Sequence, residues 1–264
     1  MKEQSIPLHF QNIEGLGKPI RTYSRSTLSK FGYIFGIIVG FAVGIYLLLE
    51  GLVWYPQRFP DVADSNSPYV IGLGVVFLLG SLYFTWRIVT RWNEMLVVYE
   101  KGFAYFTGRR MEVFKWKEIT MISMHVIKQM VYGVIPAGTQ RKYQIRKQSG
   151  EEIKLDGSLS EPDDFINRVR EGANPYIFSR TKEYFETDQL LDFGAVAISK
   201  TKGIIKGKKN YLWSDIGQIS VNKGTMWVEP KEKGLFRRFS FPVTGMANFD
   251  ILMMLAYEMA EKNK

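Results

Sequence analysis

The chain has 264 residues and a formal net charge of +9, and 46% of its residues are hydrophobic. It contains no Cys, which excludes disulfides, thiolate nucleophiles and zinc–thiolate sites. Only two histidines occur, His9 and His125, so a His-based triad would depend on one of them and a two-His metal site on both. The length suits one or two domains with a real core.

Two long uncharged runs lie in the first third of the chain, at residues 31–49 and 69–86. At a rise of about 1.5 Å per residue, each run covers roughly 27–29 Å, which is close to the hydrocarbon thickness of a bilayer. A cleaved signal peptide is the competing interpretation of the first run, but its apolar region would be shorter. We therefore predict a transmembrane hairpin over residues 31–92, with spans at about 31–54 and 69–90.

The charges that flank these runs predict the orientation of the hairpin. Residues 1–30 hold five cations against two anions, whereas the linker 55–68 holds one cation against two anions. Positive residues mark the cytoplasmic side of a membrane protein. We therefore expect a multi-pass protein of the cytoplasmic membrane with both termini in the cytoplasm and residues 1–30 as an N-terminal tail.

Glycine recurs at every fourth position of the first run, at Gly32, Gly36, Gly40 and Gly44. Small residues at this spacing let the backbone of another helix approach closely. Two interpretations stay open: this helix-packing groove joins the two helices of the hairpin, or it joins two copies of the protein into a homo-oligomer.

After the second run the hydrophobic period changes to two, which is typical of strands. Residues 114–122 follow the pattern aromatic-x-Trp-x-acidic-Ile-x-x-Ile, and residues 211–219 repeat it. Turns and alternating strands surround both stretches in the same order, and each series closes on an amphipathic helix. The sequence therefore predicts one module used twice.

The boundaries of the two copies follow from the predicted helices. The first copy covers 93–174, and its closing helix is expected to begin at Ser160 as N-cap and to stop near Gly172. A linker helix over 175–190 joins it to the second copy at 191–264.

This order resembles the pleckstrin-homology-like (PH-like) superfold and is most similar to the bacterial PH-like domains of small membrane-anchored proteins. The resemblance covers about residues 93–264. It implies a membrane α-helical hairpin plus two tandem α+β domains, each an antiparallel β sheet or barrel capped by a C-terminal helix. It also implies structural core roles for Trp116, Ile119, Trp213 and Ile216, and a binding or scaffolding module that performs no reaction.

Nine cations on predicted turns and strands are candidate contacts for anionic lipid headgroups. They are Lys200, Lys202, Lys206, Lys208, Lys209, Arg237, Arg238, Arg109 and Arg110. Each Lys or Arg near an anionic leaflet is worth about 1 kcal/mol of attraction. The competing interpretation is that these residues form solvated turns. Their charges would keep the protein soluble and prevent its edge strands from pairing with another chain.

No motif of a catalytic, cofactor or metal site is present, because G-x-S-x-G, P-loop and H-E-x-x-H strings are all absent. His125 lies in a predicted strand, and the acidic pairs at 151–152 and 163–164 flank a turn and begin a helix, so each has a structural explanation. Nucleic acid is disfavoured as a partner because no recognition motif accompanies the modest basic excess.

We therefore expect a non-enzymatic membrane-anchored adaptor, or scaffold, that presents tandem PH-like domains at the cytoplasmic membrane face to a protein or peptide partner. The alternative is an anionic-lipid-binding or lipid-sensing module. A third interpretation is a structural oligomeric membrane component, which would require the glycine groove to self-associate.

Overall fold

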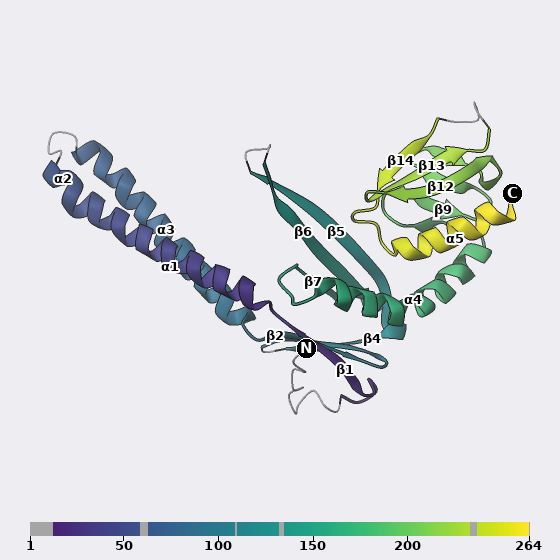
Figure 1. The fold of residues 1–264 in the computed structure, drawn as a ribbon, viewed down its shortest axis with the longest axis horizontal. Coiled ribbons are helices and arrows are strands. Elements are labelled where there is room, and N and C mark those ends of the chain that lie inside the picture. The colour runs from purple at the N-terminus through teal and green to yellow at the C-terminus, as the bar shows by residue number, and fades with distance from the viewer. Residues whose placement is uncertain (1–12, 59–62, 109, 132–134, 233–236, 264) are drawn as a thin grey trace.

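A computed structural model describes residues 13–58, 63–108, 110–131, 135–232 and 237–263. Figure 1 shows three parts in chain order: a long helical hairpin, a first β-rich domain at its foot and a second β-rich domain beyond it. The described strands form four small antiparallel sheets and close no barrel, so the fold is α+β with two additional apolar helices.

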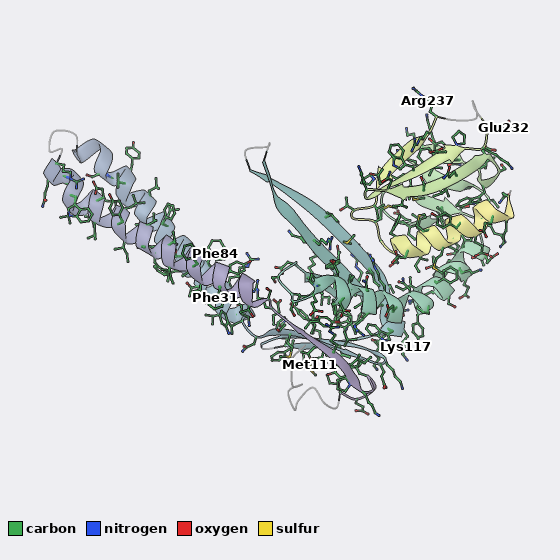
Figure 2. The ribbon with its side chains drawn as sticks, viewed as in Figure 1. Phe31, Phe84, Met111, Lys117, Glu232 and Arg237 are labelled. Atoms are coloured by element: carbon green, nitrogen blue, oxygen red, sulfur yellow. The ribbon has the colours of Figure 1, made fainter. Side chains whose placement is uncertain are left out.

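The helical hairpin consists of α1 (Thr27–Leu49), a π-helical turn (Glu50–Trp54), the short α2 (Tyr55–Arg58) and α3 (Ala63–Arg91). Two stretches of it, Lys30–Arg58 and Ser67–Thr90, are long and apolar enough to cross a membrane. Their side chains are hardly buried, and Phe31 and Phe84 lie exposed near the foot of the hairpin in Figure 2. A soluble monomer rarely exposes so large an apolar surface.

Strand β1 (Pro19–Ser24) corrects the expectation of an N-terminal tail over residues 1–30. It precedes the hairpin and pairs antiparallel with β2 (Glu94–Tyr99), which follows the hairpin. Tyr23 on β1 is 1% exposed and packs edge-on against Phe165. The strand was missed because only one of its six residues is fully buried, so its alternation is weak.

The first domain contains two sheets and one long helix. One sheet has the order β1-β2-β3-β4 and the other the order β5-β6-β7. The remaining elements are β3 (Gly102–Thr107), β4 (Met111–Lys115), β5 (Ile119–Val131), β6 (Ile135–Lys147), β7 (Glu152–Leu155) and α4 (Pro162–Glu186). The far ends of β5 and β6 leave the domain as a two-stranded ribbon (Figure 1).

The second domain has the same order of elements: four strands, then three strands, then a helix. Its sheets have the orders β11-β10-β9-β8 and β12-β13-β14. The elements are β8 (Leu191–Asp192), β9 (Ala197–Ser199), β10 (Gly203–Lys206), β11 (Lys209–Tyr211), β12 (Ile216–Asn222), β13 (Thr225–Pro230), β14 (Phe239–Pro242) and α5 (Phe249–Lys262).

The repeated tryptophans occupy equivalent positions in the two domains. Each begins a 3₁₀ turn between the two sheets, at Trp116–Glu118 and Trp213–Asp215. Both rings are buried, and each indole N–H donates to a backbone carbonyl, of Glu100 at 3.0 Å in the first domain and of Ser199 at 2.9 Å in the second. Ile119 and Ile216 follow in the core.

Helix α4 differs from the two helices that were predicted for this region. It runs without a break from Pro162 to Glu186, through both Gly172 and Pro175. Gly172 serves packing rather than helix termination, because a Cβ there would lie 2.5 Å from the Trp116 ring. Glu161, and not Ser160, is the N-cap residue, with φ 56°. The hydroxyl of Ser160 instead accepts a hydrogen bond from the end of β1 at 3.4 Å.

Candidate functional site

The foot of the hairpin is tied directly to the first domain. The amide of Ser26, just before α1, donates to the Ser158 carbonyl at 2.7 Å. The guanidinium of Arg25 is 6% exposed, lies 4.0 Å from Glu94 and stacks 5.0 Å from the centre of the Tyr33 ring on α1. The pairing of β1 with β2 therefore joins both ends of the hairpin to one sheet of the first domain.

Cations and aromatic rings gather at this foot. The Lys30 ammonium lies 5.0 Å from the centre of the Trp92 ring. The β3–β4 turn also lies here, because a Cβ at Gly108 would be 3.7 Å from the Thr90 carbonyl at the end of α3. Arg110 on that turn is exposed, whereas Arg109 lies outside the described residues. Tryptophan and basic side chains in such a place are typical of a membrane–water interface.

The five lysines of the second domain do not form one patch. The β9–β10 turn carries Lys200 and Lys202, and the β10–β11 turn carries Lys208, so the two groups lie at opposite ends of β10. Lys200 pairs with Glu186 at 2.7 Å. Lys206 donates to a carbonyl of β14 at 2.8 Å and covers an aromatic ring of the same strand. A run that is dense in sequence is therefore divided in space.

The remaining candidate cations are also spread over the second domain. Arg238 pairs with Glu229 at 3.1 Å and stacks 4.1 Å from the Trp227 ring. Arg237 lies at the rim of the domain in Figure 2. Along with Lys202 and Lys208, Lys209 is exposed and has no ion pair within the described part of the chain. Among the described residues, these cations are thus spread over several strands and turns of the domain.

The glycine groove divides into two halves. Gly40 and Gly44 face α3, where a Cβ at Gly44 would lie 2.8 Å from the Leu78 side chain. A Cβ at Gly32 or Gly36 would meet nothing within 4 Å among the described residues. The upper half of the groove, Gly40 and Gly44, therefore packs α1 against α3. The lower half, Gly32 and Gly36, is open among the described residues.

The acidic pair that begins α4 is held by tyrosine and arginine. The Tyr143 hydroxyl donates to Asp163 at 2.6 Å, and Arg141 also bonds this carboxylate. The Tyr143 bond is the main cause that lowers the pKa of Asp163. Burial and the same bond raise the pKa of Tyr143 to about 12. Among the described residues, no three His, Asp or Glu side chains form a group that could hold a metal ion.

A segment of the second domain lies along the outer edge of β5 in the first domain. The Gly245 amide donates to the Met124 carbonyl, and the Asn248 amide donates to the Ile122 carbonyl, both at 2.8 Å. The Val126 amide donates to the Thr244 hydroxyl at 2.7 Å. Residues 244–248 therefore act as an added strand on β5.

The side chain of Asn248 fastens the end of this added strand. Its Oδ1 accepts from the Ile122 amide at 2.9 Å, and its Nδ2 donates to the Thr120 carbonyl at 2.8 Å. Asn248 has φ 48°, a left-handed conformation that Asn tolerates well. Met246, in the middle of the segment, is 2% exposed. The sequence did not predict this contact, because residues 244–248 resemble an ordinary loop before a helix.

The family model of DUF6585, a family of unknown function, matches residues 1–264. The chain belongs to this family. None of the curated proteins matches the chain at a significant level.

Three features of this DUF6585 chain lie at its surface or at the contact between its two domains. Two exposed apolar helices leave a folded domain, a belt of cations and rings surrounds their foot, and one sheet edge already holds an extended segment.

Proposed function

We propose that the chain is a non-enzymatic membrane-anchored adaptor whose tandem PH-like domains lie at the cytoplasmic face of the membrane. One observation carries this proposal. The apolar hairpin begins directly at β1 and returns directly to β2, and these two strands pair with each other. A bilayer around α1 and α3 would then hold the first domain against its surface with no flexible linker.

The order of elements supports the PH-like part of the proposal. Each domain has a four-stranded sheet, a three-stranded sheet and a closing helix; α4 packs against the Trp116 turn and β5, and α5 packs against the Trp213 turn and β12. Folds of this kind commonly serve as binding surfaces, but a fold does not define a function. The adaptor role therefore rests on the hairpin and on the occupied edge of β5.

Membrane fractionation of the full chain tests the anchor. The protein should stay in the membrane pellet through high salt and alkaline carbonate and should be released only by detergent. A matched variant replaces residues 26–93 with a short Gly-rich loop, which keeps β1 beside β2 because Ser24 pairs with Met95. This variant should be soluble. Release of the full chain by salt alone would overturn the anchor.

The lipid-binding alternative is favoured by the exposed Arg110 on the β3–β4 turn, which lies beside the end of α3 and is kept in the loop variant. The loop variant distinguishes it, because co-sedimentation then reports the domains without the hairpin. Salt-sensitive binding to anionic but not neutral vesicles, lost in Arg110→Glu, would favour lipid recognition. Equal absence of binding to both vesicles would favour the adaptor, whose domains act on proteins.

The third function, a structural oligomeric component, is favoured by the open lower half of the glycine groove. Gly36→Leu should abolish cross-linked oligomers of the full chain if this half joins two copies. Oligomers that persist in Gly36→Leu would exclude the groove as their interface.

A further inference from the structure

The far ends of β5 and β6 form a two-stranded ribbon, residues 127–131 and 135–140. The contact of β5 with the second domain reaches Val126, whose amide donates to the Thr244 hydroxyl at 2.7 Å. On the other side, β7 pairs with β6 only from Tyr143 onward. In the described part of the chain, the two strands of the ribbon therefore pair only with each other. A two-stranded ribbon is marginally stable in water, so a surface that covers it would stabilise it.

The residues at the end of the ribbon are apolar. Met130 on β5 pairs with Pro136 on β6, and Val131 pairs with Ile135. None of residues 129–131 and 135–138 is charged. The ribbon thus ends in an uncharged, mainly apolar stretch that projects from the domain instead of joining its core (Figure 1).

Cations lie directly behind this apolar end. Lys128 is on β5, and Arg141 and Lys142 are on β6, whereas neither strand carries an Asp or Glu. Arg141 is held by Asp163, but Lys142 is exposed and has no ion pair among the described residues. An apolar end followed by basic residues matches the order of layers in a bilayer, where anionic headgroups cover the hydrocarbon.

The ribbon points to the same side of the first domain as the helical hairpin. In Figure 1, β5 and β6 leave the domain in nearly the same direction as α1 and α3, and the far end of the ribbon lies beyond the foot of the hairpin. At about 3.4 Å per residue, the chain from Val126 to Val131 covers about 17 Å. A bilayer placed around α1 and α3 would therefore meet the end of the ribbon.

The open edges of the ribbon limit the depth that it can reach. Each edge presents backbone N–H and C=O groups that hydrocarbon cannot satisfy, so an unclosed ribbon does not span a membrane. The headgroup layer supplies water and polar partners for these groups, and it also accepts apolar side chains. The ribbon therefore fits a shallow insertion.

We propose that the end of this ribbon, residues 130–131 and 135–136, inserts into the headgroup layer of the membrane that holds the hairpin. Lys128 and Lys142 then lie against anionic headgroups. Because the hairpin tethers the ribbon to the bilayer, a contact too weak to recruit the domains by itself is sufficient. The inference rests on the proposed membrane anchor and adds a second point of attachment, which sets how the first domain faces the membrane.

Fluorescence quenching of single-cysteine variants tests the proposal, because the chain contains no Cys of its own. The full chain is reconstituted in nanodiscs of phosphatidylcholine and phosphatidylglycerol, and Val131→Cys is labelled with bimane. Lipids that carry a nitroxide below the headgroup should quench this label. Aqueous iodide should quench it several-fold less than a label at Ser149→Cys, which is exposed in the turn at the other end of β6.

A second substitution in the Val131→Cys protein shows whether the apolar character of the end causes the insertion. Ile135→Asp places a charge on the residue that pairs with Val131, and it should raise iodide quenching to the level of Ser149→Cys. Ile135→Leu is the matched control, because it keeps the side chain apolar, and it should leave both kinds of quenching unchanged.

Three results would overturn the proposal. The first is iodide quenching as strong at Val131→Cys as at Ser149→Cys. The second is a label that is shielded from iodide but not quenched by the lipid nitroxides, which would mean that protein covers the ribbon. The third is shielding that persists in Ile135→Asp. None of these results changes membrane fractionation, so the ribbon contact can fail while the membrane anchor stands.

Discussion

Replacing Asn248 by Ala should loosen the contact between the two domains. The side chain of Asn248 makes two hydrogen bonds to β5, accepting from the Ile122 amide and donating to the Thr120 carbonyl. The Ile122 amide and the Thr120 carbonyl lie on the strand edge that residues 244–248 cover. In the variant, these two groups therefore lose their hydrogen-bond partner. The left-handed backbone at residue 248 adds a second cost, because Ala tolerates it less well than Asn.

The expected magnitude follows from these two terms. Loss of two hydrogen bonds costs about 1–3 kcal/mol, at about 0.5–1.5 kcal/mol each. Ala in a left-handed conformation costs about 1 kcal/mol more. Together, about 2–4 kcal/mol should accelerate opening of the contact roughly 30- to 1000-fold, since about 1.4 kcal/mol is a factor of ten.

Amide hydrogen exchange measured residue by residue on the full chain in micelles reports this opening at Val126, whose amide donates to Thr244 and keeps that acceptor in the variant. Asn248→Gly is the matched control, because it removes the same hydrogen bonds but carries no left-handed penalty, and its exchange should be several-fold slower than that of Asn248→Ala. Unchanged exchange at Val126 in Asn248→Ala would refute the added-strand contact.

Three further perturbations test other parts of the structure. Gly172→Leu should destabilise the first domain by about 3 kcal/mol in thermal unfolding, because the side chain overlaps the tryptophan beneath α4, and Gly172→Ala should cost less; equal stability of all three proteins would contradict this packing. The Tyr143 bond lowers the pKa of Asp163, so the carboxylate contributes stability that is present above its ordinary pKa and is lost as pH falls through the lowered value. Tyr143→Phe should therefore shift acid unfolding, followed by tryptophan fluorescence, to higher pH, and an unmoved transition would argue against that bond. Gly44→Leu should lower the thermal stability of the hairpin in micelles, whereas Gly36→Leu, with open space around it, should leave it unchanged.

The sequence predicted those parts of the fold that depend on neighbouring residues. The two apolar runs can be recognised from their length and composition alone. The repeated pattern around Trp116 and Trp213 likewise predicts the turn and the strand in which it lies. Helix α4 was divided wrongly because Gly172 and Pro175 usually end helices. Here Gly172 is required because the Trp116 ring, far away in sequence, packs against it. Pro175 leaves most backbone hydrogen bonds of α4 intact.

The candidate site was less accessible to sequence reasoning, because its contacts join distant segments. The lysine run looked continuous, but a four-residue strand separates its two turns, and Lys200 and Lys206 find partners on other elements. Strand β1 is separated from β2 by the whole hairpin, and residues 244–248 from β5 by more than a hundred residues. Asn248 stands directly before α5, and an Asn in that position is by itself typical of a helix cap.

Labelling of single cysteines tests the central claim most directly, because the chain contains no Cys of its own. Gln57→Cys places a thiol at the exposed far end of the hairpin, and Lys202→Cys places one on an exposed turn of the second domain. In intact cells that express the full chain, a membrane-impermeant maleimide should label Gln57→Cys at once and Lys202→Cys only after permeabilisation. Labelling of Lys202→Cys in intact cells, or protection of Gln57→Cys there, would contradict a membrane hairpin that carries both domains in the cytoplasm.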